Sequence, residues 1–243
     1  MFEELTRFRH EYKYIEPEVN LIALQSRLHS LLKLDHNVSE KGFYSIRSLY
    51  FDDYHDSNLY EKIDGVDERT KWRIRIYDRD DNKICLERKA RKANLISKDI
   101  CLLGKDDYEK IVTGRLKIGR DKPPLLNVFA KEMAVHVLRP AVIVEYDRTP
   151  FVCSDGNTRV TIDRNIRSSS EISAFLEDRR LASRPVLAPG QNLLEVKFDS
   201  FLPGYIAHAI EHGRMRNEAF SKYYLARKFT YNGLTTGGIG RSL

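Results

Sequence analysis

Hydrophobic and polar residues alternate along much of the chain. Alternation at every second position places apolar side chains on one face of a strand and polar side chains on the other. This pattern predicts strands over residues 7–15, 43–52, 69–78, 83–90, 95–103, 140–151, 158–167 and 192–199. The strands do not alternate regularly with helices, and most are joined by short turns, which favours an antiparallel sheet.

Helical spacing of apolar residues is confined to four stretches. Residues 17–34 open with Pro17 and carry a stripe of leucines, residues 106–113 end at Gly114, and residues 125–138 stop before Pro140. Residues 205–229 form an aromatic-rich fourth stretch. We therefore expect an α+β fold, an eight-stranded antiparallel β-barrel with covering helices. No repeat or linker divides the sequence, which predicts one domain over 1–232 and a disordered tail over 233–243.

Five of the predicted strands have one charged face and one apolar face. In residues 71–77, for example, Lys71, Arg73 and Arg75 lie opposite Trp72 and Ile74. A half-exposed sheet with its polar face in water is the simplest interpretation of any single strand. Two features of the whole set favour a different one: the polar faces are biased toward Lys and Arg, and the predicted helices can cover the apolar faces. The charged faces would then line a lumen, where unpaired cations are costly and predict a bound polyanion such as triphosphate or polyphosphate.

Composition narrows the class of protein. The chain has 243 residues, 42% of them hydrophobic, which excludes a disordered chain, and a net charge of +6. No apolar run is long enough to span a membrane, and the N-terminal residues show no apolar segment typical of a signal peptide. Cys85, Cys101 and Cys153 lack metal-ligand spacing, which favours reduced thiols and a cytoplasmic location. The basic residues alternate along strands instead of forming an exposed stripe, so no nucleic-acid partner is expected.

Eight segments in order resemble a known family. They are RHEYKY (9–14), SLYFDDYHDSNLYEKIDG (48–65), RTKWRIRIYD (69–78), LERKA (86–90), EYDRTPF (145–151), VTIDRNIR (160–167), LLEVKF (193–198) and AFSKYYLA (219–226). Together they resemble the VTC (vacuolar transporter chaperone) polyphosphate polymerase domain of the triphosphate tunnel metalloenzyme superfamily. The resemblance implies an eight-stranded tunnel, in agreement with the alternation.

The resemblance also implies roles for individual residues. It assigns Arg73, Arg75, Lys89 and Arg148 to the triphosphate as catalytic contacts, Lys13, Lys197 and Lys222 to polyphosphate, and Glu195, Glu11 and Glu87 to a metal. Glu11 and Glu87 are the weaker metal candidates, since either could instead pair with a neighbouring arginine. Arg9 stands where many superfamily members carry a glutamate, and VTC-type domains tend to have a basic residue there. This departure favours a polymerase and one metal ion over two.

The function implied is transfer of the ATP γ-phosphate to a growing polyphosphate chain, with a divalent cation, Mn²⁺ or Mg²⁺, as cofactor. Two alternatives remain open: a tripolyphosphatase or nucleoside triphosphatase of the same fold, and a non-catalytic module that binds polyphosphate. ATP and polyphosphate are the expected partners, and a separate membrane protein is left open as another.

Overall fold

The computed structural model describes residues 9–63, 65–66, 68–92, 95–211 and 216–235, which contain ten strands and six α-helices. The strands are β1 (His10–Pro17), β2 (Lys33–Leu34), β3 (Tyr44–Asp52), β4 (Arg69–Tyr77), β5 (Asp80–Lys92), β6 (Leu95–Leu103), β7 (Arg139–Cys153), β8 (Thr158–Ser169), β9 (Arg184–Pro185) and β10 (Gln191–Phe198). The helices are α1 (Glu18–Leu31), α2 (Ser57–Ile63), α3 (Lys105–Val112), α4 (Pro124–His136), α5 (Gly204–Ile210) and α6 (Lys222–Thr235).

The strands form one antiparallel sheet, and the fold is α+β. The strand order is β1-β10-β8-β7-β3-β4-β5-β6, with β2 pairing with β7 and β9 with β8. All eight predicted strands are therefore confirmed, and the two additional strands have two residues each. In the described residues no ladder joins β1 to β6, so the expected closure into a barrel is not confirmed.

The chain divides into two compact units. The first unit comprises residues 1–46, 145–166 and 187–220, and the second comprises residues 47–144, 167–186 and 221–243. Each unit is described by itself below. The prediction of a single domain over 1–232 stays a prediction. Helix α6 includes residues 233–235 of the expected tail, and residues 236–243 lie outside the described residues.

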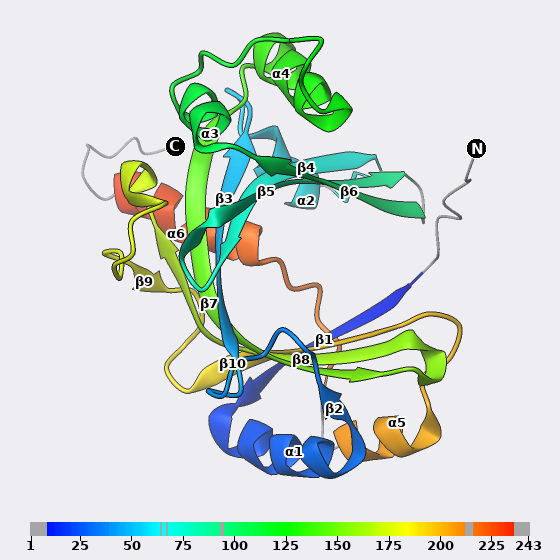
Figure 1. Cartoon of the computed structure of the whole chain (residues 1–243). Helices are drawn as coiled ribbons and strands as arrows, with labels where there is room; N and C mark the ends of the chain where they lie inside the picture. The colour runs from blue at the N-terminus through cyan, green and yellow to red at the C-terminus, as the bar shows by residue number, and fades with distance from the viewer. Residues whose placement is uncertain (1–8, 64, 67, 93–94, 212–215, 236–243) are drawn as a thin grey trace. The chain divides into compact units, whose positions relative to one another are not determined.

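In the first unit, helices cover the apolar face of β1, β10 and β8. Tyr12 pairs with Val196, and Val196 pairs with Val160, so these side chains share a face. Leucines of α1 and Ile206 of α5 pack on this face to form one buried cluster. Figure 1 shows α1 and α5 side by side along these strands, in agreement with their mutual contacts. The burial explains why the leucine stripe predicted over 17–34 forms a helix here.

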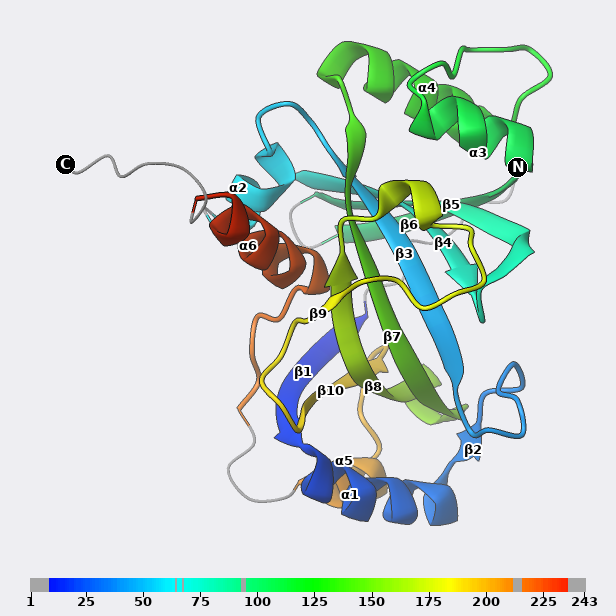
Figure 2. The same cartoon turned by 90° about the vertical axis from the view of Figure 1, so that its left-hand side faces the viewer.

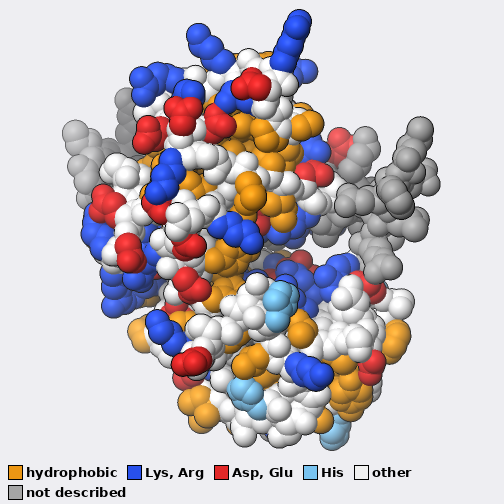
Figure 3. All heavy atoms as spheres, in the orientation of Figure 1, with side chains coloured by type: hydrophobic (Ala, Val, Ile, Leu, Met, Phe, Trp, Pro, Cys, Tyr) orange, Lys and Arg blue, Asp and Glu red, His pale blue; other side chains and the backbone are white. Residues whose placement is uncertain are grey.

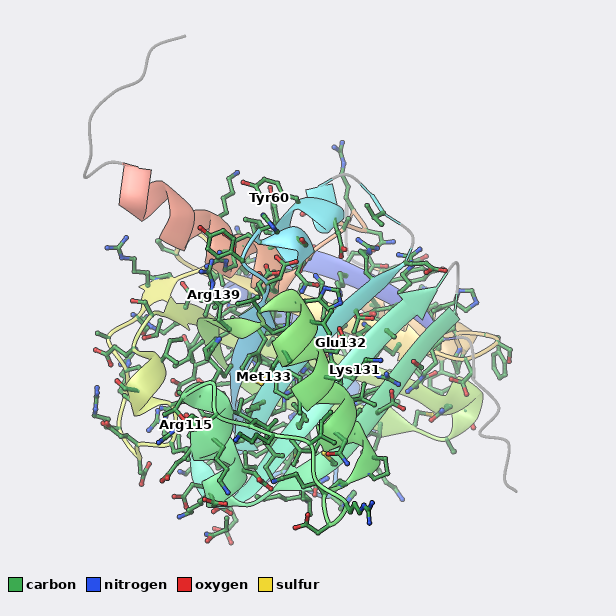
Figure 4. All side chains as sticks on the ribbon, turned by 90° about the horizontal axis from the view of Figure 1, so that it is seen from above. Tyr60, Arg115, Lys131, Glu132, Met133 and Arg139 are labelled. Atoms are coloured by element: carbon green, nitrogen blue, oxygen red, sulfur yellow. The ribbon has the colours of Figure 1, made fainter. Side chains whose placement is uncertain are left out.

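In the second unit, the apolar face of β4 and β5 is covered by α3 and α4. Trp72, Ile74 and Leu86 are at most 2% exposed and pack with Phe129 of α4 in one core cluster. Figure 4 looks down on α4, which lies across the strands with Met133 on it, and Met133 is half-buried against the same core. Helices thus cover the apolar face of β4 and β5, and the opposite face of these two strands is charged.

The predicted helix over 205–229 is wrong in extent, because the structure has two separate helices, α5 and α6. Between them the chain bonds to β1: the Lys13 amide donates to Asn217 Oδ1 at 3.0 Å, and the Glu218 amide donates to the Lys13 carbonyl at 2.8 Å. These long-range hydrogen bonds satisfy backbone groups that a continuous helix would have paired internally. The resumed helix α6 packs beside α2 in the second unit (Figure 2).

Charged side chains of both signs are interspersed over the face of the molecule drawn in Figure 3. The three cysteines are free thiols, with Cys85 buried and the other two half-buried. None of the helices in the described residues combines the length and apolar character that a membrane span requires.

Candidate functional site

The ten candidate residues fall into two groups, one in each compact unit. The first unit contains Glu11, Lys13, Arg148, Glu195 and Lys197, and the second contains Arg73, Arg75, Glu87, Lys89 and Lys222. No comparison bears on their individual roles, which stay predictions. Their geometry decides what each group can do.

In the first unit, four candidates form a quartet on β1 and β10. Strand register places Lys13 opposite Glu195 and Glu11 opposite Lys197, so all four share a face. Lys13 Nζ lies 3.0 Å from Glu11 Oε1 and 3.8 Å from Glu195 Oε2. Lys197 Nζ lies 2.6 Å from Glu195 Oε1 and 3.8 Å from Glu11 Oε1. Each lysine therefore contacts both carboxylates, and Glu195 is only 5% exposed.

Arg148 of β7 joins the quartet to a carboxylate that our site prediction omitted. Its guanidinium donates to both oxygens of Asp163, at 2.6 and 2.7 Å, and its Nη2 lies 4.0 Å from Glu195 Oε1. Asp163 is fully buried, and a bidentate pair of this kind fixes the arginine plane. Asp163 alternates with the apolar Val160 and Ile162 along its strand, and this pattern was the available signal.

In the second unit, three cations converge on Glu87 of β5. Arg73 approaches Glu87 Oε2 through Nε and Nη2, each at 2.6 Å, while Lys98 Nζ and Arg75 Nη1 lie 3.1 and 3.8 Å from Oε1. Glu87 is 2% exposed and Arg75 5%. Burial alone would raise the pKa of Glu87, but Arg73, Arg75 and Lys98 outweigh it and lower the pKa to about 2. The carboxylate is therefore ionised at neutral pH.

Two residues of β3 also form hydrogen bonds with Arg73 and Arg75. Arg75 Nε donates to Ser48 Oγ at 3.1 Å, and Arg73 Nη1 donates to the Tyr50 hydroxyl at 3.2 Å. Burial alone would raise the pKa of Tyr50, but Arg73, Arg75 and Lys222 lower it. Lys222 contributes to this lowering, and its assignment to polyphosphate stays a prediction.

Helix α6, which begins at Lys222, is fixed to the strands by buried polar contacts. The Tyr223 hydroxyl donates to Asp52 Oδ2, and Arg227 Nη2 lies 2.5 Å from Asp56 Oδ1. Asp52 is fully buried and also accepts the Asn58 amide of α2 at 3.0 Å. The position of Lys222 thus depends on carboxylates of the SLYFDD segment that our site prediction left out.

The charged face of β4, β5 and β6 carries far more cations than anions. Lys71 pairs with Lys89 and Lys89 with Lys98, which puts three lysines in one cross-strand row. Like charges directly opposite one another destabilise a sheet. Lys98 was not among the predicted site residues, and the register of β6 with β5 places it on this face. The row favours a site for an anion.

Lys89 and Lys98 of this row are exposed, and the case for a lumen rests on other charged residues that are buried. A solvated sheet face leaves its charged side chains in water, whereas Arg75, Glu87 and Glu195 are each at most 5% exposed. Within the described residues, no group of three or more His, Cys, Asp or Glu side chains is placed to hold a metal. The arrangement suits binding of a phosphate-rich anion.

Comparison with solved structures gives the class of fold. An adenylyl cyclase-like protein from Hippeastrum, described as having a dominant triphosphatase activity, matches with a TM-score of 0.52 at 13% identity, over 90% of this chain and 95% of that one. A proposed adenylate cyclase from Bacillus halodurans matches with a TM-score of 0.48 at 11% identity, over 98% of this chain and 94% of that one. The chain therefore shares its fold with the Hippeastrum protein.

The particular family follows from the sequence. The model of the VTC domain matches residues 8–231, and the chain belongs to this family. The resemblance drawn from the eight segments is thereby confirmed. No match is found among curated proteins.

Proposed function

We propose that this chain is a polyphosphate polymerase, which transfers the γ-phosphate of ATP to the end of a growing polyphosphate chain. Membership of the VTC family supports this proposal. The observation that carries it is the charge of one sheet face. Over residues 71–75, 85–89 and 98–102, five cations share the face with a single carboxylate, Glu87. Such an excess favours an anion with several charges.

Phosphoryl transfer needs positioning and charge neutralisation more than covalent chemistry by the protein. In the proposal, Arg73 and Arg75 hold the triphosphate of ATP, because the guanidinium fork matches two phosphate oxygens at once. Lys89 and Arg148 contribute further cationic contacts to phosphate. Glu87 is assigned here to positioning the arginines and not to the metal, because Arg73, Arg75 and Lys98 already surround its oxygens.

The quartet on β1 and β10 is assigned to polyphosphate and to the metal ion. Lys13 and Lys197 bind polyphosphate phosphates, as does Lys222 of α6. Glu195 and Glu11 are assigned to a divalent cation, Mg²⁺ or Mn²⁺, which would have to displace the lysines that now contact both carboxylates. Such ions combine one or two carboxylates with phosphate oxygens and water. When bound, the cation neutralises phosphate charge. The closed eight-stranded tunnel that the family implies is part of this proposal.

Two other functions remain as candidates. In a triphosphatase, water replaces the phosphate acceptor, and the activity described for the Hippeastrum protein keeps this possibility open. In a binding module, polyphosphate is held without turnover. Glu195 argues against a pure binding module, because binding an anion does not require a buried carboxylate among cations.

One assay separates the three functions. The full chain is incubated with ATP and Mn²⁺, and the products are measured as ADP, free phosphate and gel-resolved polyphosphate. Long chains with ADP support the proposal. Free phosphate without chains supports the triphosphatase, and no turnover supports the binding module.

A pair of variants connects the activity to the proposed residues. Arg73→Lys keeps the charge next to Glu87 but loses the fork, and we expect its turnover to fall more than tenfold with an unchanged circular dichroism spectrum. Arg120→Ala, an exposed arginine between α3 and α4, is the matched control and should retain turnover. Equal rates in both variants would contradict the role of Arg73.

A further inference from the structure

The charged face of the second unit ends in exposed apolar side chains on β6. Ile100 lies directly opposite Glu87, and Leu102 lies opposite Cys85. Ile100 is 53% exposed and Leu102 is 61% exposed, whereas Glu87 beside them is 2% exposed. Exposed apolar residues are unusual on a sheet face, where they are ordinarily buried. Two neighbouring exposed apolar side chains beside buried ion pairs indicate a surface that another group covers.

Polarity changes in one direction along this face. Three successive cross-strand rows contain Lys71, Lys89 and Lys98, then Arg73, Glu87 and Ile100, and then Arg75, Cys85 and Leu102. Rows two residues apart are separated by about 7 Å, so the face passes from purely cationic to largely apolar over about 14 Å. The ring of Tyr77, next on β4, lies 5.9 Å from the Arg75 guanidinium and adds an aromatic surface at the apolar end.

A nucleoside triphosphate has the same gradient. Its phosphates are anionic, and its base presents a flat face that packs on apolar and aromatic side chains. Polyphosphate has no apolar part, so an apolar surface beside the arginines adds nothing to its binding. The surface therefore distinguishes the phosphate donor from the polymer.

We propose that Ile100 and Leu102 form the nucleoside-binding surface of this protein, on which the base and ribose lie while the phosphates extend past Arg73 toward the row of lysines. The inference rests on the proposed function, since it takes a nucleoside triphosphate as the donor. It adds two residues that lie outside the eight family segments and that distinguish ATP from polyphosphate.

The test compares two ligands that differ by the nucleoside. Dissociation constants of ATP and of inorganic tripolyphosphate are measured by calorimetry on the full chain and on Ile100→Ser and Leu102→Ser. Each variant should weaken ATP about tenfold, as expected for an apolar contact to a ligand, and leave tripolyphosphate within about twofold of the wild type. Ile118→Ser is the matched control, because Ile118 is 65% exposed and lies between α3 and α4, off this sheet. It should change neither constant.

Other outcomes overturn the inference in recognisable ways. Equal weakening of both ligands would mean that the two residues only support the phosphate site. Unchanged ATP affinity together with a changed mass in light scattering would mean that the surface binds a second copy of the chain. Selective loss of ATP binding in a protein that makes no polyphosphate would uphold the nucleoside surface and overturn the polymerase. A wild-type chain that binds neither ligand would overturn both.

Discussion

The most direct test of the charge arrangement in the second unit is Glu87→Gln. The substitution keeps the shape of the side chain and removes the negative charge that Arg73, Arg75 and Lys98 surround. Arg75 is 5% exposed and would be left near other cations without this counter-charge. Removing one member of a buried ion pair costs about 3–5 kcal/mol.

The lowered pKa of Glu87 follows from the same ion pairs. It is lowered from 4.5 to about 2, and a drop of that size corresponds to about 3 kcal/mol of stability. Because the pKa is lower in the folded state, this contribution is fully present above about pH 4.5 and is lost as the pH falls toward 2.

Urea unfolding at pH 7 and at several values down to pH 2.5 provides the assay. At pH 7 the free energy of unfolding of Glu87→Gln should lie about 3 kcal/mol below that of the wild type, and the gap should narrow as the pH falls. Glu109→Gln, on the exposed side of α3, is the control and should stay within about 0.5 kcal/mol at every pH. A gap under about 1 kcal/mol at pH 7, or one that does not change with pH, would refute the reasoning.

Three further substitutions test other contacts. Arg148→Lys loses the bidentate pair with buried Asp163 and should lower the free energy of unfolding by about 2 kcal/mol, measured by urea unfolding; an unchanged midpoint would contradict the pairing. Tyr223→Phe leaves Asp52 without one hydrogen bond and should lower the free energy of unfolding by about 1–3 kcal/mol; a stability equal to the wild type would show that the contact is dispensable. Glu195→Gln should raise the Mn²⁺ concentration needed for half-maximal ATP turnover about tenfold or more, and an unchanged metal titration would remove Glu195 from the proposed metal site.

The strands were predictable because their signal is local. Alternation in residues 69–78 and 83–90 defines both the strand and its faces, and the pairing of Arg73 with Glu87 follows once those two strands are adjacent. Helix α2 was missed although its start is encoded nearby. Asp53 Oδ1 accepts the Ser57 amide at 2.9 Å and Asp52 Oδ1 accepts the Asn58 amide, which are capping bonds of short polar residues.

Features that depend on distant residues could not be predicted in this way. Between α5 and α6, Asn217 Oδ1 accepts a hydrogen bond from the Lys13 amide and the Glu218 amide donates one to the Lys13 carbonyl, about 200 residues earlier, and nothing in the local sequence shows these bonds. The ion pair of Arg148 with Asp163 was also not predictable. Alternation shows which face of a strand a residue lies on, but it does not show which charged residue on that face will pair with it. The family resemblance supplied the site residues, and the structure supplied their neighbours.

The pairing of β1 with β10 has a consequence for synthesis of the protein. The first strand, with His10 opposite Phe198, cannot form its ladder until the last strand of the sheet has been made. At 5–20 residues per second the ribosome needs roughly 10–40 s for that interval. During this time the nascent chain carries an alternating strand with open hydrogen-bonding edges, a form that is prone to mispairing. Conditions that slow translation should therefore lower the soluble yield of this protein, and molecular chaperones that bind extended segments should raise it.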